Sequence, residues 1–333
     1  MNSVELQVAF FNRIKENMPG HLSFVDEVAE KLHISTDSAY RRIRGEKPLT
    51  LEEAGILSVE FKVSLDQFFS QDPVSGSLLF SAKYIDRDNE DIEGYLKGLH
   101  NQLEYFNSFA EKEITYINKD LPIFYCFMFP ELASFKYYFW SRYNLNYSDF
   151  RKASYSAKEE SNIIPIRLGK QISDSYINIP STEVWNLDSV SLSLYQLEYC
   201  RQSKIFASEQ DVLDIYNGLH KLIDHIEDQV DAGVKFLPGK KPHSGSAKYK
   251  VFINEFVAGD NTVIVQLDNK KIVSLNHNTL NYMTTSNERF VEYTCQTVQN
   301  LLRKSALISE TGEKERHLFF NKLRWRINQS MNS

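Results

Sequence analysis

The sequence predicts a mainly α protein of the α+β class, in which a domain of five short helices precedes a larger helical domain with a small antiparallel β-meander. Apolar residues recur at helical spacing in short segments of residues 1–72 and in longer segments between residues 88 and 236. Three short runs rich in β-forming residues lie near residues 249–276, and turn-forming residues separate them.

Length and charge limit the classes of protein that the chain can belong to. A chain of 333 residues suits two or three domains. Its 42% hydrophobic and 25% charged residues are typical of a globular protein. The net charge of −6 excludes a protein that coats nucleic acid, because non-specific affinity comes from Lys and Arg that neutralise phosphates. Any DNA contact must therefore come from a small basic patch, helped by dimerisation and base contacts.

We expect a soluble, cytoplasmic protein. The most apolar window, residues 121–140, contains Pro130, Glu131 and Lys136, whereas a membrane span needs about 20 residues with few or no charges. Residues 1–5 contain no basic segment followed by an apolar one, so we expect no secretory signal. The three cysteines are Cys126, Cys200 and Cys295. Their wide spacing predicts no disulfide framework.

The first domain is expected at residues 1–72 and to contain five helices. The expected helices cover residues 4–17, 23–32, 36–44, 50–61 and 64–69. Ser23 and Thr50 are good N-caps, and Gly45 follows the third helix as a terminator. A turn of only three residues, 33–35, separates the second helix from the third, which is the geometry of a helix-turn-helix.

Residues 28–69, VAEKLHISTDSAYRRIRGEKPLTLEEAGILSVEFKVSLDQFF, carry a specific combination of features. These are an Ala-x-x-Leu second helix, an x-Ile-Ser turn, a polar third helix followed by glycine, a fourth helix and a Val-Ser-Leu-Asp start to the fifth. The combination resembles the phage-repressor-like (XRE-type) family of helix-turn-helix regulators. The resemblance implies a bacterial transcription regulator that binds double-stranded DNA and is associated with the nucleoid. The alternative is an all-α protein-interaction module.

The resemblance also implies which residues contact DNA. It puts the third helix, residues 36–44, in the major groove with its N-terminal residues toward the base edges. Thr36, Asp37, Ser38 and Arg41 would then contact bases. Arg41 is the strongest candidate, because a bidentate contact of Arg with guanine is the commonest specific contact. Phosphate contacts would come from Ser23, Arg44 and Lys47, while Tyr40 and Arg42 either contact the DNA backbone or pack within the domain.

The positive charge of this domain is local. Acidic residues outnumber basic ones in residues 1–69, and the basic cluster consists of Arg41, Arg42, Arg44 and Lys47. The alternative interpretation of the cluster is a solvated helix end, where cations favour the C-terminal end of the helix dipole.

The second domain is expected at residues 77–333, after a linker at residues 72–76. The expected elements are a weak strand at 77–84, a helix at 88–112, a strand at 113–118, helices at 163–179, 187–202 and 208–236, and closing helices at 286–303 and 311–327. The sequence PSTE at residues 180–183 indicates a boundary between elements. Runs at 250–256, 262–267 and 271–275, with turn residues between them, predict the antiparallel meander.

Residues 116–155 contain more aromatic side chains than one amphipathic helix face requires. One interpretation is a large aromatic core with a dimer surface. The other is an apolar ligand pocket, in which tyrosine hydroxyls supply polar contacts. The ligand-binding candidates are Tyr138 and Tyr143. Contact with a membrane surface is disfavoured because basic residues are sparse in this stretch.

No motif supports an enzyme, and we expect no catalytic residue, cofactor or metal. The chain contains no phosphate-loop, dinucleotide-binding, HExxH or GxSxG motif. His220 and His225 are five residues apart on an expected helix, so they point away from each other and make poor metal partners.

Two function classes remain for the whole chain. In the first, a homodimeric DNA-binding regulator binds a small-molecule or peptide effector in its larger domain. In the second, the larger domain is a dimerisation and protein-interaction module without a small-molecule effector, as in an antitoxin or a developmental switch. An apolar cavity lined by the aromatic stretch favours the first class, and a filled aromatic core favours the second.

Overall fold

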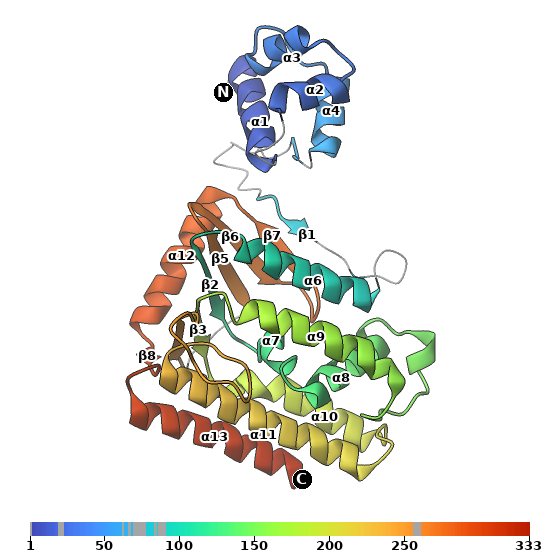
Figure 1. Ribbon diagram of the computed structural model, residues 1–333, viewed down its shortest axis with the longest axis vertical. Helices are drawn as coiled ribbons and strands as arrows, with labels where there is room; N and C mark the ends of the chain where they lie inside the picture. Colours follow the sequence, from blue (N-terminus) through green and yellow to red (C-terminus); the bar gives the residue numbers. More distant parts are fainter. Residues whose placement is uncertain are drawn as a thin grey trace. The chain divides into compact units, whose positions relative to one another are not determined.

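The computed structural model describes residues 2–18, 23–61, 63–65, 68, 78–82, 85, 91–255 and 261–333. The chain divides into two compact units, Met1–Leu79 and Phe80–Ser333 (Figure 1). We call them the N-terminal unit and the larger unit. The linker expected at residues 72–76 lies outside the described residues.

Four helices of the N-terminal unit are described, and they match the expected ones to within a few residues. They are α1 (Ser3–Asn17), α2 (Phe24–Lys31), α3 (Thr36–Ile43) and α4 (Leu51–Glu60). Capping boxes begin α1, with Asn2 and Glu5, and α4, with Thr50 and Glu53. Residues 66, 67 and 69 of the fifth helix, expected at residues 64–69, lie outside the described residues.

The N-terminal unit has its own hydrophobic core. Its buried apolar residues are Phe10, Phe11, Ile14, Val28, Ala29, Leu32, Ala39, Leu57 and Val63. Helix α3 contributes the fully buried Ala39 and the partly buried Ile43 to this core. Because only one narrow side of α3 faces the core, the rest of the helix is free to carry polar and charged side chains.

The larger unit is built around an eight-stranded mixed sheet with the order β1-β7-β6-β5-β2-β3-β4-β8. The strands are β1 (Ser81–Ala82), β2 (Lys112–Ile117), β3 (Ser181–Trp185), β4 (Tyr249–Ile253), β5 (Thr262–Leu267), β6 (Lys270–Asn276), β7 (Tyr282–Thr285) and β8 (Ala306–Leu307). Strands β2, β3 and β4 are parallel, and the other pairings are antiparallel.

The small meander expected near residues 249–276 is wrong in its first strand. Strand β4 pairs with β3 and β8, whereas β5 pairs with β2 and β6. The consecutive antiparallel strands are therefore β5, β6 and β7. A boundary between elements does lie next to residues 180–183, where α9 (Ile163–Tyr176) has ended and β3 begins, but the sequence did not predict β3 itself, whose five residues are all buried. A strand that is covered on both faces carries no alternation of apolar and polar residues, which explains why the pattern did not reveal it.

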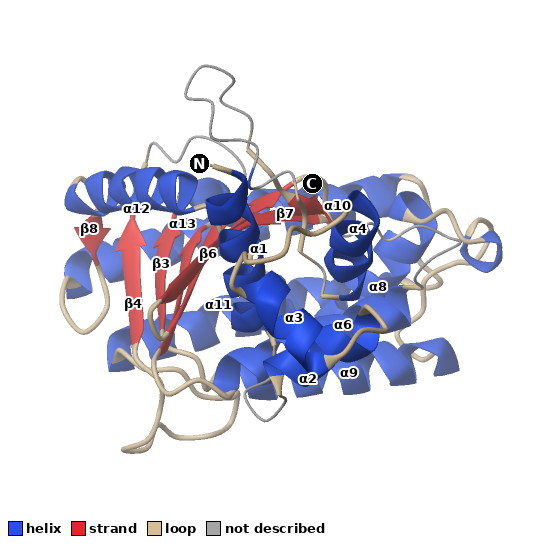
Figure 2. Ribbon diagram, turned by 90° about the horizontal axis from the view of Figure 1, so that it is seen from above, coloured by secondary structure: helices blue, strands red, loops and turns tan. Residues whose placement is uncertain are grey.

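Helices cover both faces of this sheet (Figure 2). Helix α12 (Glu288–Arg303) lies on one face, where Val291 and Val298 pack with Val184 and Ile264 of the strands. The other helices gather on the opposite side: α6 (Ile92–Asn107), α7 (Ile123–Cys126), α8 (Pro130–Phe139), α9 (Ile163–Tyr176), α10 (Ser191–Gln202), α11 (Glu209–Ala232) and α13 (Glu313–Met331). None of the helices in the described ranges is long and apolar enough to cross a membrane.

Candidate nucleic-acid interface

The turn between α2 and α3 fixes the place where α3 begins. His33 adopts a left-handed conformation with φ of 52°, and the N–H of Ile34 donates to the carbonyl of Ala29 at 3.0 Å. The Ser35 hydroxyl caps α3 by accepting a hydrogen bond from the N–H of Ser38 at 3.3 Å. These local bonds hold the turn between the two helices.

Most of the candidate base-contacting residues lie on the open side of α3. Thr36, Asp37 and Arg41 are exposed, Ser38 is half-buried, and Tyr40 is 49% exposed. Asp37 and Arg41 are four residues apart, so they share one face of the helix. Arg44 follows three residues later and continues that face. The structure therefore brings these three charged side chains together on the side away from the core.

Arg42, for which the sequence left DNA contact and packing as alternatives, packs inside the N-terminal unit. It is 5% exposed, and its Nε and Nη2 atoms donate to the Glu53 carboxylate on α4 at 3.0 and 2.6 Å. Its Nη1 donates to the carbonyl of Ser38 at 3.2 Å. These hydrogen bonds hold the pKa of Glu53 below its ordinary value. Arg42 thus ties α3 to α4, and its guanidinium does not face the open side.

Glu46 lies beside the exposed cations. Its carboxylate is 3.9 Å from Nε of Arg41 and 3.8 Å from Nη1 of Arg44. The Arg44 guanidinium also lies 5.6 Å from the ring centroid of Tyr40. Exposed ion pairs of this kind contribute little stability, so a phosphate can replace Glu46 as the partner of either arginine at low cost.

Ser23 and Lys47 lie at the ends of their elements. Ser23 is the exposed N-cap residue of α2, and its side chain makes no capping hydrogen bond. Lys47 is exposed on the loop after α3, and its carbonyl accepts a hydrogen bond from Gln7 of α1. Sequence reasoning missed Gln7, Glu46 and Glu53, because none of them belongs to the helix-turn-helix pattern itself.

Both ligand candidates in the larger unit pack against its hydrophobic core. Tyr138 is 4% exposed, and its hydroxyl donates to the carbonyl of Ala153 at 2.5 Å. Tyr143 packs edge-on against Tyr199, with ring centroids 5.3 Å apart, and burial raises its pKa to about 12. The described part of the stretch at residues 116–155 belongs to one continuous aromatic core with the helices around it.

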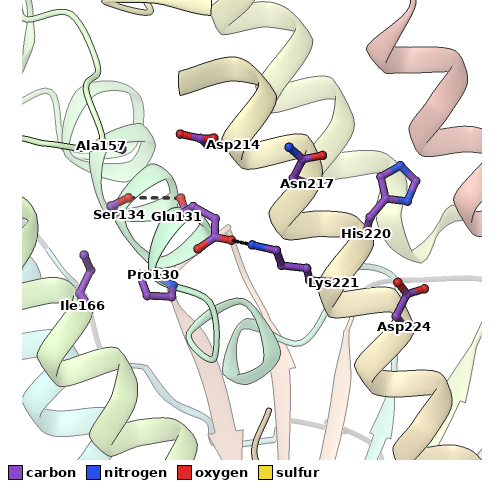
Figure 3. Close-up of a pocket in the computed structure, with 10 residues that line it drawn as sticks. All are labelled: Pro130, Glu131, Ser134, Ala157, Ile166, Asp214, Asn217, His220, Lys221 and Asp224. Carbon is purple, nitrogen blue, oxygen red and sulfur yellow. Dashed lines mark hydrogen bonds and ion pairs between the residues drawn. The ribbon is translucent and has the colours of Figure 1, made fainter. Parts of the chain in front are cut away.

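One hollow in the described surface lies between α8 and α11, and neither tyrosine is among the residues that line it (Figure 3). It encloses about 530 Å³, and its lining residues are Pro130, Glu131, Ser134, Ala157, Ile166, Asp214, Asn217, His220, Lys221 and Asp224. The Glu131 carboxylate points across it and lies 3.4 Å from Nζ of Lys221. Gly218 makes room for this carboxylate, since a Cβ there would lie 2.5 Å from Cγ of Glu131.

A carboxylate is buried at the centre of the larger unit. Glu183 of β3 has no exposed surface, and its two oxygens accept six hydrogen bonds. The donors are the hydroxyls of Tyr125 and Tyr176 at 2.7 Å, of Tyr249 at 3.1 Å and of Ser181 at 3.2 Å, Nε1 of Trp185 at 2.8 Å, and Nδ2 of Asn118 at 3.4 Å. Burial and the charge of Glu183 raise the pKa of all three tyrosines.

Lys235 lies against the same cluster. It is 2% exposed, and its Nζ lies 3.5 Å from the ring centroid of Tyr176. Within the described residues, Nζ of Lys235 has no hydrogen-bond partner. Burial lowers the pKa of this lysine to about 7, and the charge of Glu183 offsets only part of that effect. The cluster is a polar network inside the core, since Glu183, Lys235 and the three tyrosines are all buried.

The two histidines on α11 have separate environments. Nε2 of His220 lies 3.0 Å from Oδ1 of Asn328, and Nε2 of His225 lies 2.8 Å from the carbonyl oxygen of Phe236. No group of three or more His, Cys, Asp or Glu side chains suited to a metal ion occurs within the described ranges.

The chain matches no family model, no curated protein and no solved structure.

Proposed function

We propose that the protein is a sequence-specific DNA-binding transcription regulator whose helix α3 enters the major groove. The observation that carries this proposal is the division of α3 into two sides. Ala39 and the Arg42–Glu53 pair secure one side to the unit, while Asp37, Arg41 and Arg44 share the open side. Such a helix, held by a short turn after α2, is what major-groove recognition requires.

The proposed contacts divide into two kinds. Thr36, Asp37, Ser38 and Arg41 contact base edges, with Arg41 bidentate to guanine. Ser23, Arg44, Lys47 and the Tyr40 hydroxyl contact phosphates and fix the register. Arg42 takes no part in either kind, because Glu53 and the carbonyl of Ser38 already occupy its guanidinium.

We further propose that the protein acts as a homodimer. A single small DNA-binding unit buries little surface on DNA, and the net charge of −6 provides no general attraction to phosphates. Two copies would read an inverted repeat whose half-sites lie one helical turn, roughly 34 Å, apart. The filled aromatic core around Tyr138 favours a larger unit that mediates dimerisation or protein contacts over one with an effector pocket in that stretch.

Selection of bound duplexes from a random-sequence pool by the purified full chain tests this proposal. We expect an enriched site with two-fold symmetry, and binding that weakens with salt in proportion to the phosphates contacted. A variant that combines Arg41→Ala with Arg44→Ala serves as the negative control, because both side chains are exposed and their loss leaves the core intact. Enrichment of no sequence by the wild-type protein, or equal enrichment by the control, would refute DNA recognition through α3.

Sedimentation at micromolar concentration tests the dimer separately. We expect a mass of twice 38.7 kDa for the full chain. A monomer in solution together with a selected site that lacks symmetry would contradict the two-fold arrangement while leaving DNA binding in place.

A further inference from the structure

We propose that Gln7 of α1 is a positioning residue for DNA binding, which holds the loop after α3 so that Arg44 and Lys47 meet the phosphates. The inference rests on the proposed function, but it assigns a role to a residue outside the helix-turn-helix. Gln7 lies 35 residues before Arg42 and 42 residues before Leu49, so the contact is long-range in sequence.

One side-chain amide anchors this loop at three points. Nε2 of Gln7 donates to the carbonyl of Arg42 at 2.6 Å and to the carbonyl of Lys47 at 2.8 Å. Oε1 of Gln7 accepts a hydrogen bond from the N–H of Leu49 at 2.9 Å. The amide thus uses both of its donors and its acceptor on backbone groups at the end of α3, in the middle of the loop and just before α4.

The backbone of the loop also rests directly on α1. Gly45 has φ of 76°, and a Cβ at this position would lie 2.6 Å from Cγ1 of Val4. Glycine is therefore favoured here for its backbone conformation, and any larger residue would also displace the Val4 side chain. The N–H groups of Glu46 and Lys47 donate to the carbonyl of Arg41 at 2.8 and 3.2 Å, which closes the turn on the side of α3.

This anchoring is useful because the side chains of Arg44 and Lys47 point outward. Both residues are exposed, and they project from a segment whose backbone is fixed by Gln7 and Val4. A loop without the anchor would have to be ordered when DNA binds, and that ordering reduces affinity. Because phosphates carry no sequence information, the loss should affect every DNA sequence alike.

The test compares the full-length wild-type protein with Gln7→Met and with Asn12→Met as a matched control. Methionine keeps the length of the side chain and removes its donors and its acceptor, and Asn12 is an exposed residue of the same helix. The probes are a labelled duplex that the wild-type protein selects from a random pool and an unrelated duplex of equal length. Circular dichroism establishes the temperature range in which all three proteins are folded.

We expect Gln7→Met to weaken binding to both duplexes about tenfold, the scale of one or two lost hydrogen bonds. The slope of log affinity against log salt should decrease in magnitude by about one to two, because Arg44 and Lys47 no longer meet phosphates together. Asn12→Met should match the wild-type protein in both quantities. A general loss of fold would lower the binding-competent fraction without changing the salt slope, so the slope separates positioning from stability.

A double-mutant cycle with Lys47→Ala completes the test. If Gln7 acts through the loop, Gln7→Met should have a smaller effect in the Lys47→Ala background than in the wild-type protein. Equal affinity and slope for Gln7→Met and the wild-type protein, or strict additivity with Lys47→Ala, overturns the inference. Where Gln7→Met does not fold, Gln7→Glu replaces it, since a carboxylate keeps the acceptor for Leu49 but repels the two carbonyls. Failure of the wild-type protein to bind either duplex would instead refute the proposed function.

Discussion

Replacement of Lys235 by methionine should remove a pH dependence from the stability of the larger unit. The ammonium of Lys235 is buried against the ring of Tyr176, and burial lowers its pKa from 10.5 to about 7. Methionine has a similar shape and no charge, so it fills the same space without the cost of desolvation. Glu183 keeps its six hydrogen bonds from other side chains in this variant.

The magnitude follows from the two pKa values of Lys235. The unfolded chain keeps the proton up to pH 10.5, whereas the folded protein releases it near pH 7. Between these values the unfolded state binds one more proton, so the stability of the folded protein rises with pH by about 1.4 kcal/mol per pH unit. From about pH 7.5 to about pH 9.5 the wild-type protein should gain about 2–3 kcal/mol relative to Lys235→Met. Below pH 7 both states hold the proton and the difference becomes constant.

Other buried groups titrate in the same range but cancel in this comparison. Burial raises the pKa of Cys126 and Cys200, so both thiols stay protonated in the folded protein while the unfolded chain loses their protons. Their contribution therefore lowers stability as pH rises. Since Lys235→Met leaves both cysteines in place, the difference between the two proteins isolates the lysine.

Denaturant unfolding followed by tryptophan fluorescence measures this difference. The three tryptophans are Trp140, Trp185 and Trp325, and all lie in the larger unit, so the signal reports on that unit alone. The matched control is Lys240→Met, which removes an exposed lysine five residues away. The control should follow the wild-type protein at every pH. A wild-type slope that persists in Lys235→Met would show that the folded protein holds this lysine protonated, and the reasoning would be refuted.

Three further predictions concern the two units. Arg41→Ala should weaken binding to the selected DNA site by about 1–3 kcal/mol. Arg44→Ala or Lys47→Ala should instead weaken binding to every DNA sequence alike and reduce the salt slope by about one. Binding isotherms over a salt series measure both effects, and identical behaviour of the three variants would contradict the assigned roles. Arg42→Met should destabilise the N-terminal unit by about 2–3 kcal/mol, because it leaves the half-buried Glu53 without its partner. Unchanged stability in thermal melts followed by circular dichroism would contradict this prediction. Tyr138→Ala should destabilise the larger unit by about 3–5 kcal/mol, while Tyr138→Phe should cost about 1 kcal/mol in denaturant unfolding. An alanine variant as stable as the wild-type protein would support the alternative interpretation, in which Tyr138 lines a pocket.

The amphipathic helices could be predicted from the sequence because each carries its own signal. The spacing of apolar residues at 208–236 predicts a helix, and α11 covers Glu209–Ala232. Strand β5, Thr262–Leu267, begins and ends where the β-rich run does. The pairing of the strands could not be predicted, since β2 is joined to β3 and β5 by contacts across long stretches of chain. Local periodicity holds no information about such partners.

For the candidate site, the sequence likewise predicts on which side of α3 each residue lies, but not the partners of these residues on other helices. Helical geometry turns each residue by 100°, so Arg42, three residues after the buried Ala39, belongs on the inner side of α3. Arg41 and Arg44 lie on the other side by the same geometry. The partner of Arg42 could not be found in this way, because Glu53 lies on another helix and already has a local role in the capping box with Thr50. Gln7 carries no signal of its own, and only the folded unit shows what its amide contacts.

The buried tyrosines around Glu183 have a physical reason that composition alone does not reveal, and one of them, Tyr125, belongs to the aromatic stretch at residues 116–155. A buried tyrosine hydroxyl needs a partner, which suggested a pocket, but the structure supplies that partner in the form of a buried charge. The hydroxyls of Tyr125, Tyr176 and Tyr249 all donate to Glu183, and phenylalanine in their places would leave the carboxylate short of donors at a cost of several kcal/mol. The tyrosines therefore make it feasible to bury Glu183 at the centre of the sheet. Because the hydroxyls of Tyr125 and Tyr138 already have partners in the core, we do not expect either of them to bind an effector, and the hollow beside Glu131 is one described surface at which to test for effector binding.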